Sequence, residues 1–142
     1  MAEPATLPPR LVLYDGMCAV CNRAVQDLLK IDRGGVLRFA PLQGETAAAV
    51  RRRHPEIPPD LDSIIYVEAT DQGERVSWWS DAAFRIADAV DMRSVALACL
   101  RRLPRRLTDL AYRVFARLRY RVFGKLDVCP LPSPEVRARF LP

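Results

Sequence analysis

The sequence has few of the side chains that form metal sites: it contains one histidine, His54, and four cysteines. A structural zinc site takes four such ligands, which usually come in closely spaced pairs. Cys18 and Cys21 form one Cys-x-x-Cys pair, whereas Cys99, Cys129 and His54 stand alone in the sequence. We therefore expect no resident metal, and a zinc-stabilised binding domain is kept as a minor alternative.

Long apolar runs are also missing, because no stretch approaches the roughly 18–20 residues of a membrane-spanning helix. The N-terminus, MAEPATLPPR, lacks the basic start and the apolar segment of a secretory signal. We therefore expect a cytoplasmic protein in a reducing compartment, where structural disulfides are rare. In that setting a Cys-x-x-Cys pair is more typical of catalysis or metal binding.

Internal repeats, low-complexity segments and nucleic-acid-binding motifs are absent as well, and 142 residues suffice for one hydrophobic core. Charge is unevenly distributed: residues 1–92 hold 10 Lys and Arg against 14 Asp and Glu, whereas residues 93–142 hold 12 against 3. We predict a flexible N-terminal lead over 1–9, a core over 10–92, and a basic helical extension over 93–142 that packs on the core.

Hydrophobic periodicity predicts the elements of an α/β fold. The predicted strands cover 10–15, 36–40, 63–69 and 74–79, and the predicted helices cover 18–32, 44–53 and 81–90, the last with Ser80 as its N-cap. Helices join the first three strands, so we expect these strands to be parallel, while the turn TDQG makes the last pair antiparallel. The order β-α-β-α-β-β-α gives a mixed four-stranded sheet, followed by helices over 93–103 and 104–123.

The cysteine pair follows the first strand and an Asp-Gly turn. Cys18 falls in the first turn of the helix, where unpaired N–H groups and the helix dipole stabilise a thiolate, the attacking species in disulfide exchange. Cys21 lies three residues further on the same helical face, and we expect it to be more deeply set and to resolve a mixed disulfide formed at Cys18. Two inert buried cysteines are the remaining alternative.

Asp15 lies at the end of the first strand, three residues before Cys18. Two roles are open for its carboxylate. It accepts the proton of Cys21 as that thiol becomes the second nucleophile, or it caps the start of the helix.

These residues carry a resemblance to a known family. The stretch YDGMCAVCNRAVQDLLKIDRGGVLRFAPLQ resembles the thiol-disulfide oxidoreductase DCC family, whose Asp-Cys-Cys motif corresponds here to Asp15, Cys18 and Cys21. The blocks LDSIIYVE, SDAAFRIAD, RYRVFGK and LPSPEVRARFLP are similar as well. The resemblance implies a thioredoxin-like fold and a protein-disulfide or general thiol-disulfide reductase activity. Substrates would be a protein disulfide or a small-molecule thiol, the electron donor is not identified, and the Cys18–Cys21 disulfide takes the place of a cofactor.

The sequence departs from thioredoxins at the residues expected to shape the substrate site. Ala19 and Val20 separate the cysteines, and the position of the usual cis-proline before the third strand corresponds to Asp62 or Ser63. We therefore predict that Asp62 and Ser63 line the site together with Ser80 and Asp81 at the start of the following helix.

The C-terminal helix is amphipathic and basic. An apolar stripe runs from Leu107 to Val122, and arginines including Arg113 and Arg119 occupy the other face. We expect the stripe to pack on the domain and the arginines to be solvated. The alternative is a non-catalytic module that docks an acidic partner or a membrane surface through these helices. Cys99 is expected in the core, and Cys129 is either a third redox cysteine or incidental.

Overall fold

The computed structural model of the protein describes residues 8–125 and 133–142. Most of the predicted N-terminal lead, and Cys129, lie outside these residues. The strands are β1 (Arg10–Tyr14), β2 (Arg38–Pro41), β3 (Ile65–Thr70) and β4 (Gly73–Trp78), and the helices are α1 (Ala19–Ile31), α2 (Glu45–Arg53), α3 (Trp79–Ala89), α4 (Val95–Arg101), α5 (Arg105–Phe123) and the short 3-10 helix η1 (Arg137–Arg139). The predicted α/β order is confirmed, and the architecture is consistent with a thioredoxin-like fold.

The four strands form one mixed sheet in the order β2-β1-β3-β4. As predicted, β1 and β2 are parallel and β3 and β4 are antiparallel. The prediction of a parallel third strand is wrong, because β3 pairs with β1 in the antiparallel direction, with Ile65 opposite Leu13. The segment that contains α2 does not carry the chain back across the sheet as a crossover helix would. Because β3 runs opposite to β1 and β2, the C-terminal ends of β1 and β2 and the start of β3 lie at the same end of the sheet.

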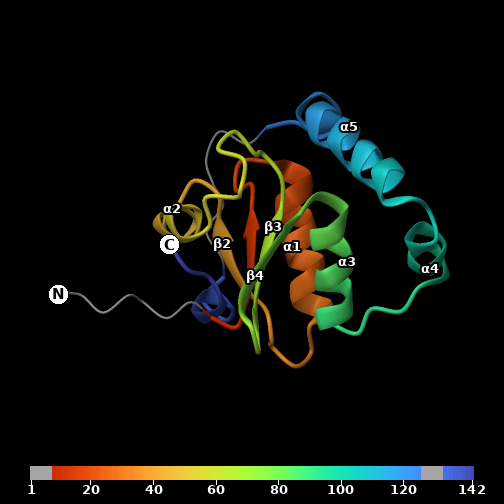
Figure 1. Ribbon diagram of the computed structural model, residues 1–142. Helices are drawn as coiled ribbons and strands as arrows, with labels where there is room; N and C mark the ends of the chain where they lie inside the picture. The colour runs from red at the N-terminus through yellow and green to blue at the C-terminus, as the bar shows by residue number, and fades with distance from the viewer. Residues whose placement is uncertain (1–7, 126–132) are drawn as a thin grey trace.

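Helices cover both faces of the sheet, with α1 and α3 on one face and α2 on the other (Figure 1). The alternation of β1 supplies side chains to both layers. Leu11 and Leu13 pack in the cluster that contains Val50 of α2, whereas Val12 and Tyr14 pack in the cluster that contains Ile86 of α3. The central strand is thus buried on both sides, which holds its C-terminal end in a fixed position.

The C-terminal residues close the outer edge of β2. The Phe140 ring stacks on Phe39 with a centroid separation of 5.4 Å, and the Leu141 N–H donates to the Phe39 carbonyl at 2.8 Å. The Pro142 carbonyl accepts from the Thr46 N–H at the start of α2, also at 2.8 Å. An edge that is covered in this way is not available for pairing with another chain.

Helix α3 begins earlier than predicted. Trp78 is its N-cap and Trp79 its first residue, with a φ of 55°. The prediction of Ser80 as N-cap is therefore wrong. The Ser80 hydroxyl instead lies 3.1 Å from the Thr108 hydroxyl and donates to Asp109, so this side chain ties α3 to α5.

Helix α5 packs against α1 and α3 with a different side from the one predicted. The apolar stripe that we expected in the core is exposed along α5, whereas Arg119 is only 1% exposed. Cys99, also predicted in the core, is exposed on α4. The polar contacts described below hold α5 in this rotation.

Candidate active site

The turn between β1 and α1 is fixed by hydrogen bonds from both sides. The Cys18 N–H donates to the Asp15 carbonyl at 3.2 Å, and the Met17 N–H donates to Asp15 Oδ1 at 3.0 Å. From inside the helix, the Asn22 amide donates to the carbonyls of Gly16 and Cys18 at 2.7 and 2.9 Å. These bonds place Cys18 at the N-terminus of α1, as the sequence predicted.

Cys18 is the N-cap of α1, and its Sγ accepts the Cys21 N–H at 3.3 Å. The sulfur therefore faces the unpaired N–H groups and the positive end of the helix dipole, both of which favour a negative charge. Since a thiolate rather than a thiol attacks a disulfide, this position suits a nucleophilic cysteine.

The relative depth of the two cysteines is the reverse of our prediction. Cys18 has no exposed surface, whereas Cys21 is partly exposed. The backbone of Cys18 forms an isolated β-bridge with Lys125, two residues beyond the end of α5. Gly124, with a φ of 83°, lets the chain turn out of α5 toward this bridge. Cys21 instead lies in the first turn of α1 and faces the space between α1 and α5.

Burial raises the pKa of the Cys21 thiol well above its ordinary value, and the hydrogen bond and charge of Cys18 raise it further. The positive charge of Arg119 acts in the opposite direction, and the negative charge of Asp15 adds to the increase. The Cys21 thiol is therefore protonated at neutral pH.

The Asp15 carboxylate is buried and surrounded by hydrogen-bond donors. Oδ1 accepts from the Gln43 amide at 2.7 Å, and Oδ2 accepts from Arg119 Nη2 at 3.0 Å and from the Tyr120 hydroxyl. The Gln43 side chain in turn accepts from the Gly16 N–H at 3.2 Å. Asp15 thus connects β1, the loop after β2 and α5. The N-cap of α1 is Cys18, so the helix-capping role that was open for Asp15 is not the one observed.

Arg119 brings a permanent positive charge into this site. Its guanidinium contacts Asp62 as well as Asp15, with 2.9 Å from Nη1 to the Asp62 carbonyl and 2.7 Å from Nη2 to Asp62 Oδ1. Burial alone would lower the pKa of Arg119, but Asp62, Cys21 and Asp15 together raise it above its ordinary value. Its Nε is buried without a hydrogen-bond partner in the part of the chain that the structure describes.

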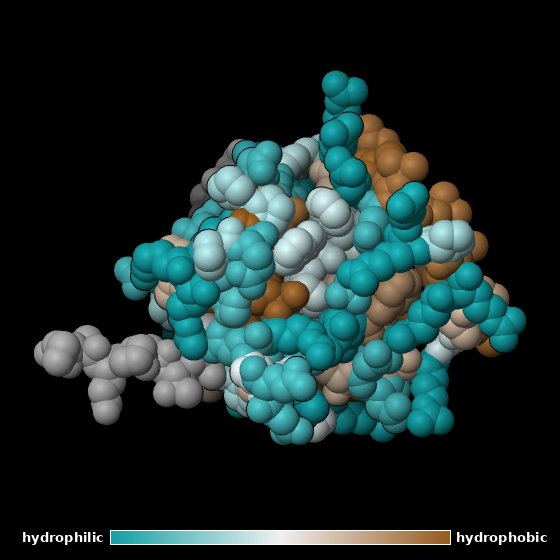
Figure 2. Space-filling model, in the orientation of Figure 1, coloured by the Kyte–Doolittle hydropathy of each residue, from teal (hydrophilic) through white to brown (hydrophobic). Residues whose placement is uncertain are grey.

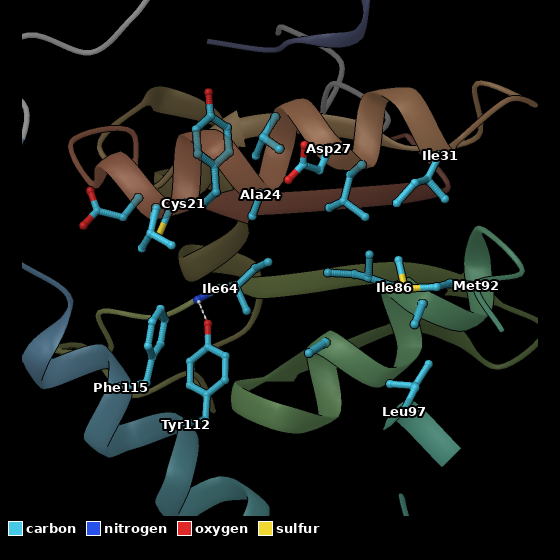
Figure 3. Close-up of a pocket in the computed structure, with 17 residues that line it drawn as sticks. Cys21, Ala24, Asp27, Ile31, Ile64, Ile86, Met92, Leu97, Tyr112 and Phe115 are labelled. Atoms are coloured by element: carbon cyan, nitrogen blue, oxygen red, sulfur yellow. Dashed lines mark hydrogen bonds between the residues drawn. The ribbon is translucent and has the colours of Figure 1, made fainter. Parts of the chain in front are cut away.

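An apolar groove of about 460 Å³ lies beside Cys21, between α1, α3 and α5. In Figure 3, Cys21 and Ala24 of α1 face Ile64, Tyr112 and Phe115 across this space. The Ile64 N–H donates to the Tyr112 hydroxyl oxygen at 3.4 Å, and burial raises the pKa of Tyr112 to about 12. We call this space the Cys21 groove. Its walls are almost entirely apolar, and the carboxylates of Asp15 and Asp27 are its charged lining groups.

The model of the DCC1-like thiol-disulfide oxidoreductase family matches residues 12–125. The chain belongs to this family. It is 34% identical to the uncharacterized protein YuxK of Bacillus subtilis over 137 residues, and this alignment covers 96% of each chain. It is 32% identical to a chloroplastic DCC family protein of Arabidopsis thaliana over 122 residues, and this alignment covers 85% of this chain and 69% of that protein. No solved structure matches significantly.

In this DCC1-like protein the structure brings together Asp15, Cys18, Cys21 and Asp62, which were predicted from the sequence. Ser63 is buried next to Ile64, and its hydroxyl donates to the Ile64 carbonyl at 3.2 Å. None of the four residues predicted to line the substrate site, Asp62, Ser63, Ser80 and Asp81, lies in the wall of the Cys21 groove. Asp62 is instead paired with Arg119 at the cysteine site. The polar groups of Ser80 and Asp81 are engaged with α5 and with Arg85, because the earlier start of α3 turns them toward those partners.

Sequence reasoning missed Gln43, Tyr112, Arg119 and Tyr120. Arg119 and Tyr120 are the first residues of the block RYRVFGK, which resembles the family. This resemblance could have pointed to them, but the helical periodicity assigned Arg119 to the solvated face. Gln43 likewise ends the first family block. Within residues 8–125 and 133–142, no three histidine, cysteine or acidic side chains form a group that could hold a metal ion.

Proposed function

We propose that this protein is a thiol-disulfide oxidoreductase of the protein-disulfide reductase type, which exchanges a Cys18–Cys21 dithiol with a substrate disulfide. The observation that carries the proposal is the hydrogen bond from the Cys21 N–H to Cys18 Sγ at the N-terminus of α1. It puts two thiols within one helical turn, one of them at a position that favours a thiolate. Membership of a family named for this chemistry supports the same conclusion.

The first step is attack by the Cys18 thiolate on one sulfur of the substrate disulfide. A bond forms between Cys18 Sγ and that sulfur, the substrate S–S bond breaks, and the other substrate sulfur leaves as a thiolate. Because Cys18 is buried beneath the Lys125 bridge, this step requires the chain after α5 to move aside.

The second step is attack by Cys21 on Cys18 Sγ, which releases the second substrate sulfur as a thiolate and forms the Cys18–Cys21 disulfide. Two electrons have then passed from the protein to the substrate. The Cys21 proton must leave first, and the substrate thiolate released in the first step is a base that can take it. Arg119 lowers the cost of a negative charge at Cys21, so we assign it a positioning and electrostatic role.

Asp15 acts in this scheme through Arg119 and the turn rather than as the proton acceptor. Its two oxygens already accept hydrogen bonds from Met17, Gln43, Arg119 and Tyr120, and the described residues show none from the Cys21 thiol. We expect substrate to contact Cys21, Ile64 and the exposed carboxylate of Asp62, whereas Ser63, Ser80 and Asp81 support the site from outside the groove.

The Cys18–Cys21 pair serves as the redox group, and an external thiol must reduce it for turnover. The reducing cytoplasm supplies such thiols, and we still expect the protein to be located there. The alternative of a non-catalytic interaction module is favoured by one observation, the exposed apolar side of α5. Turnover distinguishes the two, because a binding module does not need either cysteine.

The test is thiol-dependent reduction of a protein disulfide, with insulin as the substrate and dithiothreitol as the reductant. We expect the wild type to accelerate the reaction, and Cys18→Ser and Cys21→Ser to return it to the uncatalysed rate. Cys99→Ser, on exposed α4, is the matched control and should behave as wild type. Cys21→Ser should also accumulate a mixed disulfide at Cys18. Activity that survives in either of the first two variants contradicts the proposal.

A further inference from the structure

The side of α5 that faces away from the domain is apolar. Five side chains along it are between 44% and 67% exposed: Leu107, Leu110, Val114, Leu118 and Val122. Figure 2 shows the corresponding hydrophobic surface gathered over α5 at the upper right of the molecule. We call these five residues the α5 apolar face. A contiguous row of exposed apolar side chains bordered by polar residues marks an interaction surface.

The rotation of α5 is fixed by polar contacts, so the α5 apolar face cannot simply turn inward. Thr108 contacts Ser80, Tyr112 accepts from the Ile64 N–H, and Arg119 pairs with Asp15. These anchors extend over three turns of the helix. Turning the apolar face toward the domain would break all three and leave the Asp15 carboxylate buried without its cation.

Positive charge borders the α5 apolar face. Residues 93–125 contain ten Lys and Arg against one acidic residue, Asp109. Arg102, Arg106, Arg117 and Arg121 are exposed and form no ion pair within the described residues. On a helical projection, Arg106, Arg117 and Arg121 lie along the flank of the apolar face that points away from the domain. The surface therefore offers apolar insertion and anion binding side by side.

We propose that α5 docks this protein on an anionic lipid bilayer, with its apolar face in the headgroup region and the flanking arginines on lipid phosphates. A helix with this pattern lies in the plane of the membrane interface, and long arginine side chains reach from it to the phosphates. In the described residues, no helix has the length and hydropathy needed to span a bilayer.

Two other occupants fit this surface less well. A second copy of the chain would cover the apolar face but would bring the arginines of two α5 helices together, which like charge disfavours. An acidic protein would neutralise the arginines but would leave the five apolar side chains without an apolar partner. A lipid surface accounts for both features.

The docking surface adjoins the Cys21 groove, because α5 contributes Tyr112 and Phe115 to its wall. A protein bound through the α5 apolar face would hold this groove close to the membrane surface. The docking itself does not depend on the redox chemistry, so it is tested by binding alone.

The experiment is co-sedimentation of the full-length protein with vesicles of phosphatidylcholine, either pure or mixed with phosphatidylglycerol. We expect binding to the mixed vesicles only, with an affinity that falls as salt is raised. Arg106→Gln/Arg117→Gln/Arg121→Gln should weaken binding about a hundredfold, since each arginine near an anionic surface contributes roughly 1 kcal/mol. The matched control, Arg23→Gln/Arg33→Gln/Arg52→Gln, removes the same charge from exposed positions on other elements and should retain most of the binding.

A second variant tests the apolar part of the surface. Leu110→Ser/Leu118→Ser should lose about tenfold in binding to the mixed vesicles, with an unchanged melting temperature because both side chains are exposed. Equal binding by this variant and by wild type overturns the proposal, because charge alone would then account for the association. A wild type that is dimeric by light scattering and becomes monomeric in this variant also overturns it, and so does tighter binding to an acidic polypeptide than to the vesicles.

Discussion

Arg119 and Asp15, 104 residues apart in the sequence, form an ion pair of 3.0 Å in which both side chains are only 1% exposed. This pair fastens the C-terminal helix to the turn that carries the cysteines. Arg119→Gln should lower the free energy of unfolding by about 3–5 kcal/mol, because it leaves the Asp15 carboxylate buried without a cation. Urea denaturation of the reduced protein measures this loss.

Arg117→Gln is the control, since Arg117 lies two residues earlier on α5 and is exposed. It should change the unfolding free energy by no more than about 0.5 kcal/mol. Asp15→Asn/Arg119→Gln should recover part of the loss, because the uncompensated charge is then removed. Equal stability of the Arg119 and Arg117 variants would show that the buried pair does not fasten α5.

The raised pKa of Cys21 predicts how its alkylation depends on pH. In a Cys99→Ser/Cys129→Ser background, the iodoacetamide rate constant at Cys21 should rise about tenfold per pH unit through pH 9, the ordinary thiol value, without a plateau. Peptide mass spectrometry follows the reaction. Cys18→Ala should bring the plateau to lower pH, because it removes a hydrogen bond and a charge that raise the pKa of Cys21.

The same shift links stability to pH. The folded protein holds the Cys21 proton more tightly than the unfolded chain does, so this contribution is complete below pH 9 and is lost as pH rises toward the folded-state pKa. Melting temperatures of the reduced protein should fall in that range more steeply than those of Cys21→Ala. A Cys21 alkylation plateau below pH 9 would contradict both expectations.

The Cys21 groove should select apolar substrates. Ala24→Phe places a large ring into the groove wall one helical turn beyond Cys21. It should lower kcat/KM for a peptide disulfide with apolar neighbours about tenfold or more, with little effect on a small polar disulfide such as oxidised glutathione. Gln26→Phe, exposed on the same helix but outside the groove lining, is the control. Similar losses for both disulfides would mean that the groove does not bind substrate.

The C-terminus should depend on Gly44. A Cβ at this position would lie 2.7 Å from the Pro142 carbonyl carbon, so Gly44→Ala must displace the backbone that bonds to Thr46. We expect a loss of about 1–3 kcal/mol in unfolding free energy, measured by urea denaturation. Gly34→Ala, whose nearest contact would be Val36 Cγ1 at 3.5 Å, should be nearly neutral. A neutral Gly44→Ala would show that residues 140–142 contribute little to stability.

The sequence was sufficient for the order of the elements and for the position of the cysteine pair. Periodicity and turn residues act locally, so the strand over 10–14, the helix after it and the hairpin over 65–78 could be read directly. The direction of β3 could not be read, because it depends on how α2 lies across the sheet rather than on the local pattern.

The environment of the cysteines depends on contacts that no local pattern encodes. Arg119 lies on the polar side of α5, and in water that side would be solvated. It is buried because Asp15 and Asp62, both far away in the sequence, provide carboxylates at the sheet edge. The apolar face of α5 is consequently turned outward, and the relative depth of Cys18 and Cys21 follows from where α5 and Lys125 come to lie.

The central claim is that Cys18 and Cys21 form a reversible disulfide. The most direct measurement is equilibration of the Cys99→Ser/Cys129→Ser protein in buffers of reduced and oxidised dithiothreitol, followed by alkylation and peptide mass spectrometry. We predict that both cysteines lose their reactivity together in one two-electron transition and recover it on reduction. If both remain alkylated under fully oxidising conditions, or if either forms only mixed disulfides, the account is contradicted.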